Sequence, residues 1–164
     1  YKAHVVPTFR RLQEEGRIQA WGITAASVPD IDLDILGSDA RPEIVQCISN
    51  VMDSTGSMAL AGREADHRAI IAAAAAAGCG VMGIRAVAAG SLTDGLDREI
   101  KPTSREQKDF DRAEPFRAIA GDLGTTTAKL AHQYALQMQG VDTVVLGVKT
   151  GRNLTRPWQA SRSS

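Results

Sequence analysis

The sequence predicts an α/β protein in which four parallel strands form one sheet covered by helices. Four mostly apolar runs of four to seven residues alternate with longer segments of helical period. Apolar runs of this length indicate strands that are buried on both faces, as in a parallel sheet. The chain has 164 residues, 43% of them hydrophobic, and 19 Lys+Arg balance 19 Asp+Glu. This composition is that of a soluble globular segment with one core.

The first half of the chain supplies two expected helices and two expected strands. Residues 2–15 form an amphipathic helix, because apolar residues recur at helical spacing and a glycine follows. Residues 18–24 and 44–48 have the length and composition of buried strands. Between them a helix is expected from Ser27 to Gly37, with a proline in its first turn and a glycine at its end.

The second half repeats this alternation with one long interruption. Residues 63–77 are rich in alanine, which favours a helix, and residues 81–87 form the third apolar strand. Residues 88–106 are polar and contain glycine and proline, so a long loop is expected there. The remaining expected elements are helices at 110–123 and 126–139 and a strand at 143–148. The hydroxyl run at 125–127 is expected to cap the second of these helices.

Charge and hydropathy argue against nucleic acid and membrane partners. The longest apolar run, residues 69–77, is shorter than the ~18 residues that a bilayer-spanning helix needs. The net charge is zero, and no cluster of basic residues offers a surface to phosphate backbones or anionic lipids. Cys47 and Cys79 lie in or beside apolar runs, so two buried, reduced thiols are expected, as in a cytoplasmic protein.

Several polar residues and one glycine motif receive a structural interpretation. His4, His67 and His132 lie among charged residues in helical patterns and are expected at the surface, and no metal site is expected. The aspartates of residues 30–34 are expected on a solvated face. Residues 78–83 match G-x-G-x-x-G, but here the helix comes first and the strand follows, the reverse of a dinucleotide-binding loop. A helix end and a tight turn are expected there.

Residues at the carboxyl ends of the four strands are the candidates for a functional site. In a parallel α/β sheet or barrel, ligands bind at those ends and at the loops after them. The candidates are Thr24, Gln46 with Ser49 and Asn50, and the segments 88–93 and 147–153. The two segments combine glycine with hydroxyl, amide or cationic side chains, which suits a nucleotide phosphate. Lys149 is either a phosphate ligand or one more solvated lysine.

At these strand ends the sequence resembles the carboxyl-terminal half of the aldo-keto reductases. The passage L-Q-E-E-G-R-I-Q-A-W-G-I-T at 12–24 resembles the family's approach to its fifth strand, and Q-C-I-S-N at 46–50 resembles its Q-x-x-Y-N. Residues 80–93 are similar to the family's seventh strand and its A-x-G-x-L-T turn. Residues 124–149 are similar to its seventh helix and eighth strand. The four stretches occur in the family's order.

The resemblance implies the carboxyl-terminal half of a (β/α)8 TIM barrel over residues 1–154, with an irregular tail at 155–164. A full barrel takes roughly 250 residues, so only half of one is expected. The family reduces aldehydes or ketones to alcohols by hydride transfer from NADPH. Its catalytic residues come from the other half, so no catalytic residue is expected here. The resemblance assigns cofactor binding to Thr24 and Gln46 at the nicotinamide carboxamide, to Ala88, Gly90 and Leu92 at the pyrophosphate, and to Gly147, Val148, Lys149, Thr150 and Asn153, with Lys149 and Thr150 at the 2′-phosphate.

Two other classes of function stay open beside the reductase segment. One is a nonenzymatic half barrel that self-associates through its exposed strand edges. The other is a module that binds the cofactor without turnover. Whether the chain is itself an enzyme is left open, and its first residue, Tyr1, agrees with a piece of a longer protein.

Overall fold

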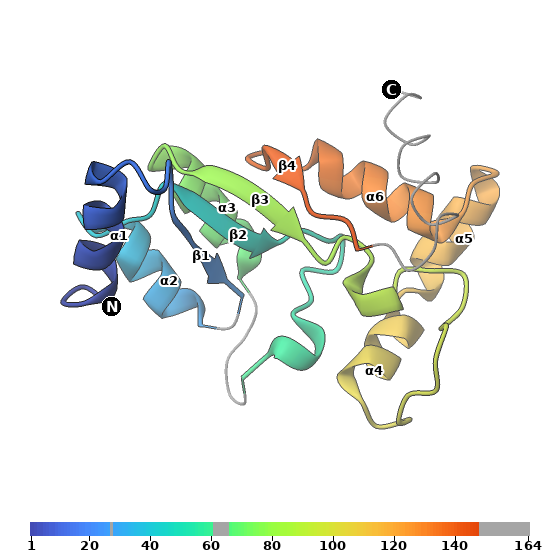
Figure 1. The fold of residues 1–164 in the computed structure, drawn as a ribbon. Coiled ribbons are helices and arrows are strands. Elements are labelled where there is room, and N and C mark those ends of the chain that lie inside the picture. The colour runs from blue at the N-terminus through green and yellow to red at the C-terminus, as the bar shows by residue number, and fades with distance from the viewer. Residues whose placement is uncertain (27, 61–65, 148–164) are drawn as a thin grey trace.

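Four parallel strands form the sheet, and their order in the sheet equals their order in the chain. The computed structural model describes residues 1–26, 28–60 and 66–147. The strands in these ranges are β1 (Gly22–Ala25), β2 (Ile44–Ile48), β3 (Gly80–Ile84) and β4 (Thr143–Val144), as Figure 1 shows. The predicted parallel α/β architecture is confirmed.

Six α-helices connect and cover the strands in the described ranges. They are α1 (Val5–Glu14), α2 (Pro29–Leu36), α3 (His67–Ala76), α4 (Arg105–Arg112), α5 (Glu114–Asp122) and α6 (Thr127–Gln137). Two short 3-10 helices, η1 (Gly56–Met58) and η2 (Ala88–Gly90), lie in the loops that leave β2 and β3. No helix in the described ranges is long and apolar enough to cross a membrane.

The helices differ most from the prediction between β3 and α6. The helix expected at 110–123 is two helices, because the first ends at Arg112 and Pro115 lies in the first turn of the second. The first of these, α4, starts inside the expected loop. There the side chain of Ser104 accepts a hydrogen bond from the backbone N–H of Gln107 at 3.1 Å. A serine followed three residues later by glutamine is a helix-start signal that the prediction missed.

The strands lie at the predicted places, but three of them are shorter than predicted. Residues 18–21 and 85–87 are not in strand conformation, and β4 has two residues. Arg85 takes a φ of 57°, which leaves the extended region and ends β3. Residue 148, at the end of the predicted fourth strand, lies outside the described residues.

The glycine motif at 78–83 forms a helix end and a turn, as predicted. Gly78 has a φ of +74° just after α3, a conformation that glycine adopts without steric cost. β3 then begins at Gly80. The motif therefore precedes a strand and does not open a helix.

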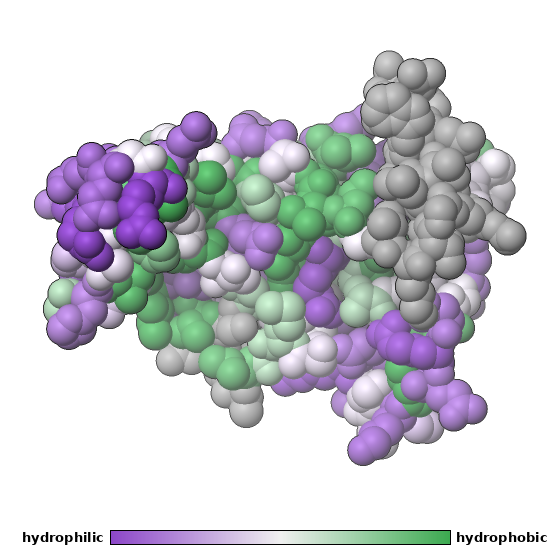
Figure 2. All heavy atoms as spheres, viewed as in Figure 1, coloured by the Kyte–Doolittle hydropathy of each residue, from purple (hydrophilic) through white to green (hydrophobic). Residues whose placement is uncertain are grey.

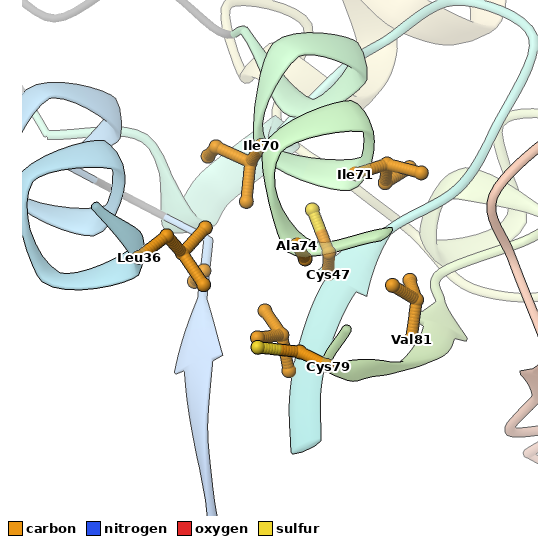
Figure 3. Close-up of a cluster of buried hydrophobic side chains, with 9 residues drawn as sticks. Leu36, Cys47, Ile70, Ile71, Ala74, Cys79 and Val81 are labelled. Atoms are coloured by element: carbon orange, nitrogen blue, oxygen red, sulfur yellow. The ribbon is translucent and has the colours of Figure 1, made fainter. Parts of the chain in front are cut away.

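A buried hydrophobic cluster joins one face of the sheet to α2 and α3 (Figure 3). Val45 and Cys47 contribute to it from β2, Val81 from β3 and Ile70 from α3, and all four are at most 1% exposed. Removal of this apolar surface from water stabilises the layered arrangement. Cys79 lies in the same cluster, and both cysteines are free, buried thiols, as predicted.

The opposite face of the sheet is open. No helix in the described ranges crosses in front of the strands in Figure 1, and Figure 2 shows apolar side chains with polar ones among them on the visible side. The register aligns Thr24, Gln46 and Met82 across β1, β2 and β3. Since Val45 faces the buried cluster, strand alternation turns Gln46 and its neighbours to the open face. In a closed barrel, this face would line the interior.

A second buried cluster fixes the loops at the carboxyl ends of the strands. Ala88 and Leu92, in the turn after β3, are 2% and 0% exposed. They pack with Ala113 at the end of α4 and with Ala131 of α6. Phe116 of α5 packs against the same cluster. The long segment between β3 and α6 is therefore anchored to the body of the protein.

Candidate functional site

The carboxyl rim, defined as the carboxyl ends of the strands and the loops that follow them, carries a polar pair on the open face. The hydroxyl of Thr24 donates a hydrogen bond to Oε1 of Gln46 at 3.1 Å. Among the described residues, the amide Nε2 of Gln46 donates only to the sulfur of Met82, at 3.8 Å. A thioether is a weak acceptor. The Gln46 amide is therefore held in place by Thr24 and keeps capacity to donate to a ligand.

The turn after β3 has an unusual backbone. Arg85, Ala88 and Ala89 have φ values of 57°, 47° and 56°, and Gly90 has 98°. Non-glycine residues rarely adopt this region, so the surrounding contacts must hold the turn. The backbone N–H of Ala88 donates to the carbonyl of Arg85 at 2.7 Å, and that of Leu92 donates to the carbonyl of Val87 at 3.1 Å. These hydrogen bonds make the turn compact, and its backbone is part of the carboxyl rim.

A cavity of about 270 Å³, called here the β3–α6 cavity, lies beside this turn. Its walls are residues 85–89 after β3, the start of α6 and residues 145–147 after β4. Two cationic side chains, Arg85 and Lys129, line it together with His132. Burial lowers the pKa of Arg85 and also lowers the pKa of His132. Nε and Nη2 of Arg85 are buried and have no hydrogen-bond partner among the described residues.

The start of α6 is positioned by side chains from two segments. The hydroxyl of Thr126 accepts a hydrogen bond from the backbone N–H of Lys129 at 3.2 Å, which confirms the predicted cap. A carboxylate oxygen of Asp94, in the loop after β3, accepts from the backbone N–H of Thr127 at 2.9 Å and from its hydroxyl at 2.5 Å. These bonds fix the wall of the β3–α6 cavity that carries Lys129.

Comparison with known families decides what kind of barrel this half sheet belongs to. The model of the Aldo/keto reductase family matches residues 3–162. The chain belongs to the aldo/keto reductase family. No curated protein sequence matches the chain.

Solved aldo-keto reductase structures share the fold. The apo form of aldo-keto reductase AKR11C1 from Bacillus halodurans is similar with a TM-score of 0.71 and 19% identity. The holo form of the same reductase gives 0.70 and 19%. The alignments cover 97% of this chain and 50% of those chains. The four parallel strands and six helices therefore match about half of an aldo-keto reductase barrel.

The residues assigned to cofactor binding by resemblance to the aldo-keto reductases lie at three places. Thr24 and Gln46 meet on the open face at the rim. Ala88 and Leu92 are buried in the turn beside the β3–α6 cavity, and Gly90 lies between them in the sequence. Gly147 lines that cavity. Val148, Lys149, Thr150 and Asn153 lie outside the described residues.

The prediction missed two cationic residues of the β3–α6 cavity, Arg85 and Lys129. Arg85 directly follows β3, a position at the carboxyl end of a strand that the general rule for parallel sheets could have selected. Lys129 lies in the first turn of α6, just after the hydroxyl run that predicted the cap. Neither belongs to a short motif, so only the position of its element in the fold brings it to the cavity.

Two predicted surface residues of this aldo/keto reductase chain are buried. His67 is 1% exposed, with Nε2 of its ring 2.8 Å from the hydroxyl of Thr55, so its predicted surface position is wrong. Asp32 is 8% exposed, so the predicted solvated face of residues 30–34 is wrong at this position. The charged neighbours of both residues in the sequence point elsewhere, because successive residues of a helix face different sides. No group of three or more potential metal ligands occurs in the part of the chain that the structure describes.

Proposed function

We propose that the chain is the carboxyl-terminal half of an NADPH-dependent aldo-keto reductase that reduces aldehydes or ketones to alcohols. In this role it supplies mainly the cofactor-binding part of the barrel. Family membership and the match to half of a barrel support the proposal. The order of the stretches that resemble the family's last four strands favours the carboxyl-terminal half.

The observation that carries the proposal is the pair of Thr24 and Gln46 on the open face. A nicotinamide carboxamide needs one hydrogen-bond donor and one acceptor. The Gln46 amide has N–H capacity that a thioether uses only weakly, and its oxygen is already oriented by Thr24. The described residues therefore fit the carboxamide, which they would hold by hydrogen bonds. When bound, NADPH supplies the hydride.

The β3–α6 cavity offers the charges that the phosphates of the cofactor need. Arg85 and Lys129 line it, so its walls carry two cationic residues that a phosphate would attract. Lys149 and Thr150 are proposed to hold the 2′-phosphate, as the resemblance implies.

Turnover needs a proton donor placed at the carbonyl oxygen of the substrate. By resemblance, the family's catalytic residues belong to the other half of the barrel. The substrate, a small carbonyl compound, is therefore proposed to react only when that half is joined to this one.

Cofactor titration of Gln46→Leu, followed by fluorescence, tests the proposal. Loss of the amide should weaken the binding of both NADPH and NADH by roughly 3- to 10-fold. The two cofactors share the nicotinamide, and one hydrogen bond contributes about 0.5–1.5 kcal/mol. Met82→Leu is the control, since it changes the neighbouring residue of the same row without removing a strong hydrogen-bonding group. Unchanged affinity in Gln46→Leu, or no binding of either cofactor to the parent protein, would contradict the proposal.

Self-association is the second candidate role, favoured by the edges of the sheet. Among the described residues, β1 pairs only with β2 and β4 only with β3, so each leaves an unpaired edge. Val145, just after β4, is 45% exposed. Such edges template association. Sedimentation velocity should show dimers or larger species, and a compact monomer that unfolds cooperatively would count against this role.

A further inference from the structure

A second cavity of the described residues has no role in the proposed cofactor site. It measures about 760 Å³ and is called here the α4 cavity. One wall is the loop after β2, residues 52–56, and the other is α4. It shares no lining residue with the β3–α6 cavity. Its volume lies within the range of about 300–1,000 Å³ that is common for small-molecule sites.

The α4 wall is basic. Arg105, Lys108 and Arg112 all line the cavity, and their spacing of three and four residues places them on one side of the helix. The side chains of Arg105 and Lys108 form no hydrogen bond or ion pair within the described ranges. Like charges one helical turn apart destabilise a helix, so two unpaired cations beside Arg112 favour a bound anion.

The two carboxylates in the lining do not cancel this charge. Asp109 is already engaged, because Nη1 of Arg112 lies 3.1 Å from its Oδ1 and the hydroxyl of Ser54 donates to its Oδ2. Asp53 is the other carboxylate, and its Oδ1 is buried without a partner among the described residues. Three cations therefore face two carboxylates, and the two cations nearest the start of α4 are unpaired.

Hydrogen bonds hold the loop wall and connect it to α4. Asn50, fully buried, accepts hydrogen bonds through Oδ1 from the backbone N–H groups of Met52 and Ser54 at 3.2 and 3.1 Å. A bond from the backbone N–H of Ser57 to Oε1 of Glu106, at 3.0 Å, joins the loop to α4. Both walls are thus held at a fixed separation, which reduces the entropy lost when a ligand binds.

We propose that the α4 cavity binds the carboxylate or phosphate group of a small molecule through Arg105 and Lys108. Its loop wall leaves the strand that carries Gln46, so the cavity opens on the same rim as the proposed nicotinamide contact. If the proposed reductase function holds, on which this step rests, the bound group is the acidic end of the carbonyl substrate. The substrate class is then carbonyl compounds that carry a carboxylate or a phosphate.

Titration of the protein with malonate and with inorganic phosphate at constant ionic strength tests the site. Backbone amide chemical shifts of residues 52–56 and 105–112 should change saturably with either probe. The double variant Arg105→Gln/Lys108→Gln should bind roughly 10-fold or more weakly, because charge-assisted contacts are lost. Lys101→Gln is the matched control, since Lys101 is exposed and does not line the cavity, and it should leave binding unchanged. Absence of saturation, or an equal loss in the control, would overturn the proposal.

NADPH titration of the same double variant separates this site from the cofactor site. Affinity for NADPH should equal that of the parent protein, because neither changed residue lines the β3–α6 cavity. NADPH binding without malonate or phosphate binding would overturn the anion site and leave the proposed function standing. Saturable anion binding without NADPH binding would support the anion site and overturn the cofactor role.

Discussion

The hydroxyl of Thr55 and Nε2 of His67 lie 2.8 Å apart in the interior of the protein. Thr55 belongs to the loop after β2 and His67 begins α3, so the contact ties a loop of the carboxyl rim to the helix that covers the sheet. On the other side of the ring, Nδ1 lies 3.9 Å from Sγ of Cys47. Burial lowers the pKa of His67, because a charged imidazole here would lose its hydration.

Stability at mildly acidic pH is expected to depend on His67. The unfolded chain binds a proton at this residue near pH 6.5, whereas the folded protein resists protonation. The contribution of His67 to the free energy of unfolding should therefore fall as the pH drops below about 6.5, by up to about 1.4 kcal/mol per pH unit. His67→Gln, which cannot titrate, should flatten this slope in urea denaturation curves at pH 5 to 6.5. Parallel pH profiles for the two proteins would refute the assignment.

Asp32 should produce a slope of opposite sign. Burial raises the pKa of this carboxyl from 3.8 to about 6, so the folded protein binds the proton more tightly than the unfolded chain. The contribution of Asp32 to the free energy of unfolding should fall as the pH rises from about 4 to about 6. Asp32→Asn should remove this slope and stabilise the protein at pH 7.5 by roughly 1–3 kcal/mol. The effect of His67→Gln is best measured in the Asp32→Asn protein, where the opposite slope from Asp32 is absent.

Asp34→Asn serves as the control for Asp32→Asn. Its carboxylate is 76% exposed and lies 3.6 Å from the ammonium of Lys2. An exposed pair of this kind contributes at most about 1 kcal/mol, so the pH profile should be nearly that of the parent protein. A stabilisation of Asp34→Asn as large as that of Asp32→Asn would mean that general charge, not burial, governs the effect.

Gly22 is expected to be required for the pairing of β1 with β2. A Cβ atom at this position would lie 2.5 Å from the backbone carbonyl oxygen of Ile44 on the neighbouring strand. Gly22→Ala should lower the free energy of unfolding by about 1–3 kcal/mol, because the strands must move apart. Gly121→Ala is the opposite case, since Gly121 lies in α5 with nothing within 4 Å of an added Cβ. That change should stabilise the protein by about 0.5–1 kcal/mol in the same denaturation assay, and equal effects of the two changes would contradict the argument.

Lys149 is predicted to select NADPH over NADH. Lys149→Met keeps much of the aliphatic stem and removes the charge. A charge-assisted contact to the 2′-phosphate contributes on the order of 1.5–3 kcal/mol, or roughly 10- to 150-fold in affinity. The affinity for NADPH should decrease and that for NADH should stay largely unchanged. The titrations use the protein that includes the rest of the barrel. Equal weakening of both cofactors would assign Lys149 to the fold or the pyrophosphate, and no change would make it a solvated lysine.

The sequence was sufficient for the parallel sheet because each strand is an apolar run with little polar interruption. Where prediction failed, local pattern and tertiary environment conflict. The charged neighbours of His67 suggest a surface residue, yet the helix turns its ring toward Thr55. The end of β3 could not be predicted from hydrophobicity, because it depends on the left-handed conformation of Arg85. The α4 cavity was not predicted at all, since it needs a loop and a helix that lie about fifty residues apart in the sequence.

The match between strand order and chain order has a consequence for how the chain is made. Among the described strands, β2, β3 and β4 each pair with the strand synthesised just before them, so this part of the sheet can grow in the direction of translation without waiting for a distant segment. The buried cluster of β1 to β3 with α2 and α3 can form before α4 leaves the ribosome. The pairing of β3 with β4 involves the fewest residues of the three strand pairs. More than fifty residues lie between these two strands, and they include α4 and α6, the helices that line the two cavities. The helical walls of the β3–α6 cavity and the α4 cavity are therefore added to a layer of β1 to β3 with α2 and α3 that precedes them in the chain.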